Sequence, residues 1–270
     1  MIDNRKAWNK ISKSYQHRYK VGVDNIYYGP LCPSENELQL MGNIFGKKII
    51  EVGSGSGQNA IYLAKKGAIV TAFDISEEQI KYGKKLAKEN GVSINFVQGN
   101  FENIRKYFPI SSFDIALSSY ALQYCMNVDS LSSTIKQINE ILISNGIFVL
   151  SFGHPVRSLG IWDEKTDKFI LDNYFDKSIK KWNYDFPEDN VNSIMIGSFK
   201  TISDYISAVI KNGFILTDFM EPKPKKEEKS NQFAVKSRYI DNQSRNPFTY
   251  NHLSRIPGTL ILKAIKKRCQ

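Results

Sequence analysis

The sequence of 270 residues contains few cysteines and no long apolar run. Cys32, Cys125 and Cys269 are an odd number without closely repeated spacing. This pattern excludes a disulfide framework and a cysteine-rich zinc site, so we expect reduced thiols and no bound metal. The longest apolar runs, such as Ile147–Leu150 and Thr259–Leu262, have the length of a strand. They are far shorter than the roughly 18 residues that cross a membrane.

The start of the chain also lacks an apolar signal core, because it reads Met1-Ile-Asp-Asn-Arg-Lys. We therefore expect a cytoplasmic protein without a membrane partner, present as a monomer or homodimer. No internal repeat is visible. The hydrophobic fraction of 41% is sufficient for a packed core and argues against global disorder.

The formal net charge is +10, which raises the question of a nucleic-acid partner. Lysine and arginine neutralise phosphates, but the excess is concentrated in Lys223–Lys229 and Lys263–Arg268, beside expected linker or terminal segments. Charge runs of this kind are usually solvated surface. We therefore keep nucleic acid only as the alternative partner.

The chain is divided by its pattern into four parts: a helical lid segment (1–45), a core (46–152), a cap (153–198) and a part that completes the core (199–270). The lid segment contains an amphipathic helix over Arg5–Tyr19. The core alternates strands with helices, which predicts right-handed βαβ units and a parallel sheet. We expect its strands at Lys47–Val52, Ile69–Phe73, Ile94–Val97, Phe113–Leu117 and Gly146–Phe152, with helices between them.

The alternation fails over residues 153–198, a segment rich in aromatic and acidic side chains and interrupted by Pro155 and Pro187. A structureless insertion of this length is unusual in a compact domain, so we expect a substrate cap with short helices. Regularity then returns with a helix at Ser203–Lys211 and strands at Phe214–Phe219 and Gly258–Ala264.

The segment Glu51-Val52-Gly53-Ser54-Gly55-Ser56-Gly57 lies between a predicted strand and a predicted helix. In this context glycines let a nucleoside ligand approach the backbone and permit a tight left-handed turn. Asp74 closes the next strand, about 20 residues further on, where an acid can accept hydrogen bonds from ribose hydroxyls. A helix cap is the alternative role of Asp74, although Ser76 already suits that role.

The segment Gln98-Gly99-Asn100-Phe101 follows the third strand. Asn100 could bond the amino group of an adenine while Phe101 packs on the ring, and taken alone Asn100 could equally be a turn residue.

These segments together resemble the motifs of class I S-adenosylmethionine-dependent methyltransferases, of the methyltransferase type 11 kind. Residues 49–57 resemble the first motif, Asp74 matches the ribose-binding acid, and Gly99-Asn100-Phe101 matches the adenine-binding motif, where the family most often has Asp in the middle. Residues 113–122 resemble the fourth-strand motif. Residues 144–147 resemble the turn into strand five, where the family usually has Pro-Gly-Gly.

The resemblance implies a Rossmann-like α/β fold. Its seven-stranded, mostly parallel sheet has helices on both faces and an antiparallel last strand. It implies S-adenosylmethionine as cofactor and S-adenosylhomocysteine as product, and it disfavours a dehydrogenase, whose glycines are spaced G-x-G-x-x-G. The cofactor-binding residues that it implies are Tyr28, Glu51, Gly53, Ser54, Gly55, Gly57, Asp74, Ile75, Asn100, Phe101, Ser118, Ser119 and Tyr120.

Methyl transfer requires an acceptor lone pair held in line with the donor bond and shielded from water. Acceptors that must lose a proton also need a carboxylate, histidine or tyrosine nearby, and Asp163, His154 and Tyr184 are our candidates. Asp163 beside Trp162 could hold a cationic amine, whereas His154 could instead orient the cap. The candidate substrate residues are Tyr15, Tyr19, Tyr27, Gln123, Arg157, Trp162 and Trp182.

The sequence thus predicts methylation of a nitrogen or oxygen of a small molecule or small modified peptide, of the natural-product type. The size of the chain, its lid and cap, and an acid placed to meet a cation also resemble plantazolicin-type peptide N-methyltransferases, which modify an N-terminal amine. RNA methylation is one alternative. A binding protein that keeps the cofactor fold without the chemistry is another.

Overall fold

The computed structural model describes residues 3–163, 165–171, 173–226 and 249–268. Its centre is a seven-stranded sheet with the order β10-β11-β5-β4-β1-β2-β3. The strands are β1 (Lys48–Val52), β2 (Ile69–Asp74), β3 (Asn95–Gln98), β4 (Phe113–Ser119), β5 (Leu142–Gly153), β10 (Phe214–Met220) and β11 (Thr259–Lys266).

The sheet has one reversed strand. β11 pairs antiparallel with both β5 and β10, whereas the pairs β5–β4, β4–β1, β1–β2 and β2–β3 are parallel. The expectation of a mostly parallel seven-stranded sheet with an antiparallel last strand is therefore confirmed. The strand order reverses between β1 and β4, and ligands of such sheets bind at the carboxyl ends of the strands beside this point.

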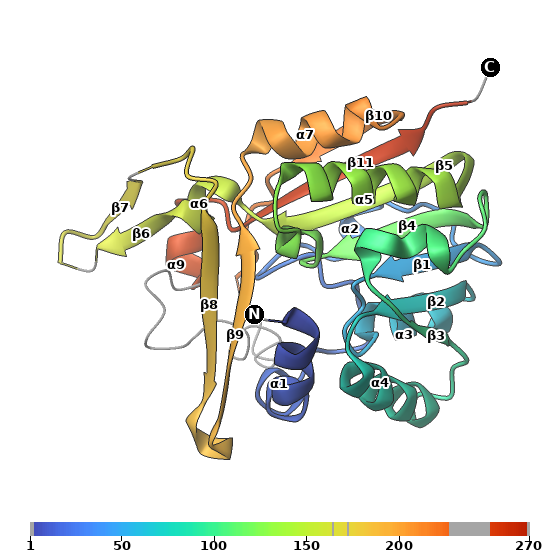
Figure 1. Cartoon of the computed structure of the whole chain (residues 1–270), viewed down its shortest axis with the longest axis horizontal. Helices are drawn as coiled ribbons and strands as arrows, with labels where there is room; N and C mark the ends of the chain where they lie inside the picture. Colours follow the sequence, from blue (N-terminus) through green and yellow to red (C-terminus); the bar gives the residue numbers. More distant parts are fainter. Residues whose placement is uncertain (1–2, 164, 172, 227–248, 269–270) are drawn as a thin grey trace.

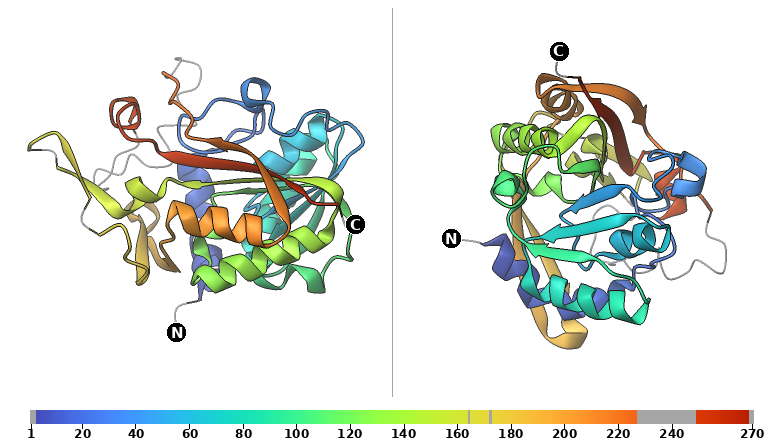
Figure 2. Two further views of the ribbon diagram at one scale, coloured as in Figure 1. Left: turned by 90° about the horizontal axis from the view of Figure 1, so that it is seen from above. Right: turned by 90° about the vertical axis from the view of Figure 1, so that its right-hand side faces the viewer.

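Helices cover both faces of the sheet (Figure 2). One face packs against α5 and α7, and the other packs against α3 and the segment that precedes β1. In α5 the residues Leu131, Ile135 and Ile138 are buried, which is the spacing of one helical face. The main helices are α1 (Asn4–Tyr19), α3 (Gln58–Lys65), α4 (Glu77–Glu89), α5 (Val128–Ile141) and α7 (Ile202–Lys211), and the shorter ones are α2 (Glu35–Leu38), α6 (Pro155–Leu159), α9 (Tyr250–Leu253), η1 (Phe101–Lys106), η2 (Leu122–Tyr124) and η3 (Pro187–Asp189).

The cap differs from the expectation of short helices. Residues 160–198 form mainly two antiparallel hairpins, β6 (Gly160–Asp163) with β7 (Lys168–Leu171) and β8 (Ile179–Phe186) with β9 (Val191–Ser198). The prediction of short helices holds for α6 and η3 but misses the four strands. Alternate residues of β8 are more buried than their neighbours, as strand geometry requires. Pro187 falls in the turn between β8 and β9, where it interrupts neither strand.

The hairpin β8–β9 packs along α1, beside the sheet (Figure 1). Ile11 and Tyr15 of α1 share an apolar cluster with Phe186 and Met195 of the hairpin. At the start of α1, Asn4 donates to the Ile196 carbonyl (2.8 Å) and accepts from the Ile196 amide (2.9 Å). Two segments far apart in the sequence thus form one wall.

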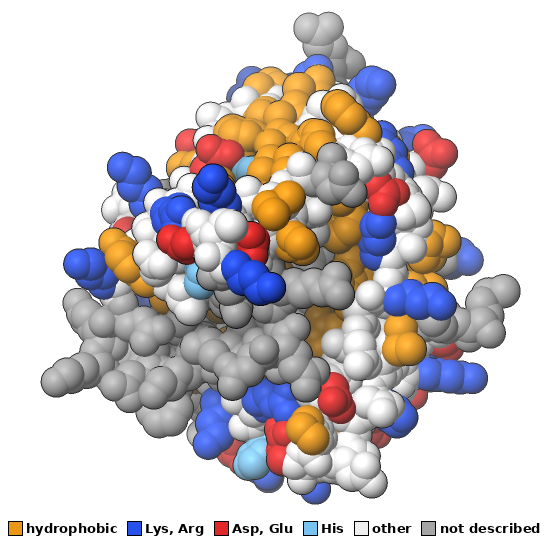
Figure 3. Space-filling model, turned by 90° about the vertical axis from the view of Figure 1, so that its left-hand side faces the viewer, with side chains coloured by type: hydrophobic (Ala, Val, Ile, Leu, Met, Phe, Trp, Pro, Cys, Tyr) orange, Lys and Arg blue, Asp and Glu red, His pale blue; other side chains and the backbone are white. Residues whose placement is uncertain are grey.

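The basic residues do not gather in a single patch on the face that Figure 3 shows. On the face shown in Figure 3, Lys and Arg side chains are scattered among acidic and polar ones, and an apolar patch occupies the upper part. Lys266, within the basic segment 263–268, is buried, and its Nζ donates to the Leu142 carbonyl at 2.7 Å. Residues 227–229 of the other basic segment lie outside the described residues. No helix in the described part is long and apolar enough to span a bilayer.

Candidate active site

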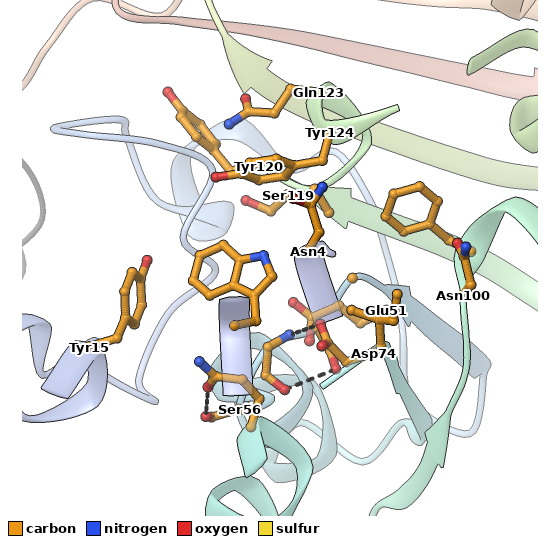
Figure 4. A pocket seen from close by; sticks show the side chains of 18 of the residues that line it. Asn4, Tyr15, Glu51, Ser56, Asp74, Asn100, Ser119, Tyr120, Gln123 and Tyr124 are labelled. Carbon is orange, nitrogen blue, oxygen red and sulfur yellow. Dashed lines mark hydrogen bonds between the residues drawn. The ribbon is translucent and has the colours of Figure 1, made fainter. Parts of the chain in front are cut away.

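A cavity of about 900 Å³ opens where β1, β2, β3 and β4 end. The glycine loop, α1, the segment around η2 and the hairpin β8–β9 all contribute to its wall. Figure 4 shows Glu51, Ser56 and Asp74 on one side, and Tyr120, Gln123 and Tyr124 on another. A volume of this size is typical of sites that enclose a drug-sized ligand.

The glycine loop has backbone conformations that favour glycine. Gly53 (φ +74°) and Gly55 (φ +54°) are both in the left-handed region. A Cβ on Gly53 would lie 2.2 Å from the Cβ of Ala121, whereas a Cβ on Gly55 would meet no atom within 4 Å. The loop therefore exposes backbone without side chains to the cavity and packs closely against the turn after β4.

Asp74 joins this loop to the start of α4. Its Oδ2 accepts from the Gly55 amide at 2.7 Å, and its Oδ1 accepts from the Ser76 amide at 2.8 Å. Burial raises the pKa of the Asp74 carboxyl, and the amides of Ser76 and Gly55 oppose that shift. Ser76 caps α4 as predicted, since its hydroxyl accepts from the Gln79 amide.

Glu51 is the second buried carboxyl group of the cavity. It accepts from Asn59 Nδ2 at 2.8 Å and from the Ala60 amide at 3.1 Å. These contacts hold it at the end of β1. Two fixed carboxyl groups, a glycine backbone and the half-buried Phe101 suit a polar nucleoside with an attached amino acid, so the residues present fit S-adenosylmethionine.

Most residues predicted to bind cofactor line the cavity, namely Glu51, Gly53, Ser54, Gly55, Asp74, Ile75, Asn100, Phe101, Ser119 and Tyr120. Asn100 also caps η1, because its Oδ1 accepts from the Glu102 amide at 2.9 Å. Tyr28, Gly57 and Ser118 lie outside the lining. Tyr28 is fully buried with its hydroxyl on Glu35, and Ser118 donates to the Val52 carbonyl at 2.9 Å.

Four aromatic side chains from three parts of the chain form what we call the aromatic corner: Trp8 and Tyr15 of α1, Tyr124 of η2 and Tyr184 of β8. All four line the cavity. The hydroxyls of Tyr124 and Tyr184 are hydrogen-bonded at 2.9 Å. Burial and the neighbouring Tyr124 and Tyr15 raise the pKa of Tyr184 well above its ordinary value, so this candidate catalytic residue stays a neutral phenol.

Asp163 and Trp162 lie outside the cavity lining. Asp163 is at the end of β6, where its Oδ1 accepts from the Lys165 amide at 3.1 Å. Trp162 does take part in a cation–π contact, but with Arg255 of this same chain, whose guanidinium carbon lies 4.5 Å from the ring centroid. Trp162 therefore packs against the α9 region, and Asp163 is held within its own turn.

His154 and Arg157 are buried and are also absent from the lining. His154 Nε2 lies 2.8 Å from Glu221 Oε1, and burial is the main cause that lowers the pKa of this histidine. Burial also lowers the pKa of Arg157 to about 10. This geometry ties the end of β5 to the segment after β10.

Of the candidate substrate residues, Tyr15, Tyr27 and Gln123 line the cavity, whereas Tyr19 and Trp182 do not. Both of the latter pack behind the aromatic corner. The ring centroid of Tyr19 is 4.6 Å from that of Tyr15, and the centroid of Trp182 is 5.7 Å from that of Tyr124.

Sequence reasoning missed a buried amide chain that connects α1 to the glycine loop. Gln58 Nε2 donates to Gln16 Oε1 at 2.7 Å, and Gln16 Nε2 donates to Gln79 Oε1 at 2.8 Å. Ser56 also donates to Gln79. Sequence reasoning missed Trp8 as well, although Trp8 and Tyr15 are seven residues apart and so share one face of the predicted helix.

Comparison with known proteins agrees with this geometry. A methyltransferase domain family matches residues 50–150. The uncharacterized methyltransferase YbaJ of Bacillus subtilis is 27% identical over 187 residues, which cover 67% of this chain and 70% of that protein. The ubiquinone biosynthesis O-methyltransferase of Haemophilus ducreyi is 32% identical over 120 residues, or 43% of this chain and 50% of that protein, so the match spans half of this relative.

The fold also has a close counterpart among solved structures. A Listeria monocytogenes protein classed with the S-adenosylmethionine-dependent methyltransferases superposes with a TM-score of 0.66 at 23% identity, covering 87% of this chain and 96% of that one. This structural similarity supports the fold. The domain match and the named relatives support the activity. The chain belongs to the class I methyltransferases and is an enzyme whose cofactor is S-adenosylmethionine.

Proposed function

We propose that the cavity transfers a methyl group to a nitrogen or oxygen of a small molecule or small modified peptide. The observation that carries this proposal is the lining of the cavity. Among the described lining residues there is no arginine, and the only lysine, Lys6, is exposed. A nucleic-acid substrate would require several cations to neutralise its phosphates, whereas an enclosed apolar wall suits a compact acceptor.

The chain's own residues have two tasks in this reaction. S-adenosylmethionine supplies a methyl group on a sulfonium, which is a good leaving group. Asp74, Glu51 and the glycine loop would hold its polar parts, while the aromatic corner and α1 would exclude water and position the acceptor. The described lining contains no histidine, so an acceptor that is neutral or already ionised fits the site best.

One observation supports oxygen as the acceptor atom and another supports nitrogen. The Haemophilus ducreyi relative is named an O-methyltransferase. Conversely, the electron-rich rings of the aromatic corner favour a nitrogen that becomes positively charged. Asp163 lies outside the lining and so gives no support to a peptide N-terminal amine as the acceptor.

The test is a transfer assay with S-adenosylmethionine that carries a labelled methyl group. The purified chain is incubated with mixtures of small amines and phenols, and separately with total RNA. We expect label in the small-molecule fraction with the wild type and not with Asp74→Ala. Label in RNA, together with salt-dependent retention of RNA by the protein, would overturn the proposal in favour of RNA methylation.

A further inference from the structure

Two rings of the aromatic corner pack edge-to-face on Trp8, nearly at right angles to it. The Trp8 centroid lies 5.3 Å from that of Tyr15 at an interplanar angle of 81°, and 5.9 Å from that of Tyr124 at 87°. The Tyr184 ring is tilted, with its centroid 5.5 Å from that of Trp8 at 52°. Rings at these angles offer no pair of parallel faces that could sandwich a flat acceptor, whereas a compact, tetrahedral group can touch several of them at once.

The charge of the cavity as a whole is compatible with a cation. The described lining contains the acidic side chains of Asp3 and Glu102 besides Glu51 and Asp74, which lie on the cofactor side, and its only basic side chain is the exposed Lys6. Aromatic ring faces carry negative potential and attract ammonium groups, more strongly when water is excluded. Neither the acidic side chains nor the ring faces would help to bind a carboxylate or a phosphate.

Hydrogen bonds between several elements also hold the aromatic corner in place. Asn4 fixes the start of α1 to β9, and Arg18, near the end of α1, donates to the Asp185 carbonyl at 2.7 Å. The buried Lys200 binds η2 to the hairpin, because its Nζ donates to the carbonyls of Gln123 (3.2 Å) and Ser198 (2.8 Å). Such support keeps ring faces in fixed directions, as preorganised sites require.

We propose that the aromatic corner binds an amine nitrogen of the acceptor and stabilises the positive charge that arrives on it. This inference rests on the proposed function. The amine reacts as its neutral free base: the nitrogen lone pair forms the new N–CH3 bond while the S–CH3 bond breaks and its electron pair stays on sulfur. Positive charge therefore moves onto nitrogen, and the surplus proton of a primary or secondary amine passes to bulk water when the product leaves the cavity.

Stabilising a charge that develops during the reaction accelerates it. An ionised phenol or carboxylate acceptor would instead lose its charge on methylation, and the ring faces would give no gain. The corner thus favours apolar amines as the substrate class.

The experiment uses choline and its uncharged isostere 3,3-dimethylbutan-1-ol as probes of the full chain saturated with S-adenosylhomocysteine. Dissociation constants are measured by protein NMR or tryptophan fluorescence. We expect choline to bind at least about tenfold more tightly than the isostere, as a desolvated cation–π site allows. Trp8→Leu should reduce this preference below about twofold, and Tyr124→Phe should keep it because the ring remains.

Trp162→Phe serves as the matched control, because Trp162 is a tryptophan outside the cavity lining, and it should bind both probes as the wild type does. If Trp8→Leu does not fold, Tyr124→Leu takes its place. Equal binding of the two probes, or no binding of either, by a protein that binds S-adenosylhomocysteine overturns this inference and leaves the proposed function intact. Failure to bind S-adenosylhomocysteine overturns the proposed function itself.

Discussion

At the scale of single residues, Asp74 both lines the cavity and holds the glycine loop by a hydrogen bond. The sequence predicted a ribose-binding acid from its place at the end of a strand, with a capping role as the alternative. In the structure it accepts from the amides of Gly55 and Ser76 while it lines the cavity. The cap of α4 is Ser76 and not Asp74, and ribose binding stays a prediction.

Burial raises the pKa of Asp74 above its ordinary value of 3.8, so the carboxylate takes up its proton at a higher pH than an exposed aspartate does. A protonated carboxyl is a weaker acceptor for two hydroxyls. We expect the affinity for S-adenosylhomocysteine to fall, by about tenfold at full protonation, as the pH is lowered from 8 through this raised pKa. Titrations across that range should show the fall in the wild type, and Asp74→Asn should bind weakly at every pH. Parallel pH profiles for the two proteins would contradict this role.

Gly53→Ala tests the close packing of the glycine loop. The new methyl group would lie 2.2 Å from the Cβ of Ala121 on a backbone at φ +74°. We expect loss of stability by about 1–3 kcal/mol, through overpacking, and at least tenfold weaker cofactor binding. Gly91→Ala is the matched control, because Gly91 has φ +67° with nothing near its Cβ. If calorimetry and urea unfolding show the same changes for both variants, the contact with Ala121 has no importance of its own.

At the scale of elements, the core helices and strands follow from local pattern. The helix expected after the second strand is α4, and it has Ser76 as its cap and two acids in its first turn, all of which are local signals. The hairpins of the cap were not predicted. Aromatic residues interrupted by proline suggested loops and short helices, and the partner that buries β8–β9, helix α1, lies more than a hundred residues away in the sequence.

The hydrogen bonds of Gln16 with Gln58 and Gln79 lead us to expect that α1 supports the cofactor loop. Gln16→Leu would leave the buried polar groups of Gln58 and Gln79 without this partner, which costs about 1–3 kcal/mol. We expect a lower urea midpoint and weaker binding of S-adenosylhomocysteine. Lys13→Ala, on the exposed side of the same helix, should change stability by less than about 0.5 kcal/mol. Unchanged cofactor affinity in Gln16→Leu would show that α1 does not support the cofactor loop.

At the scale of the whole molecule, the sequence allowed the sheet and most of the cavity lining around the glycine loop to be predicted, because these depend on short motifs at strand ends. The candidate catalytic and substrate residues were found in the lining less often. His154 and Trp162 instead face Glu221 and Arg255, which are distant in the sequence. Long-range packing decides which side of a hairpin faces the cavity, and local pattern carries no information about it.

The central claim is that one cavity at the carboxyl edge of the sheet holds the methyl donor beside its acceptor. The most direct test is calorimetric titration of S-adenosylhomocysteine into the purified chain and into Asp74→Ala. We predict one binding site of micromolar or higher affinity that the variant loses. A well-folded wild type that binds no S-adenosylhomocysteine would contradict the assignment of this cavity to the cofactor.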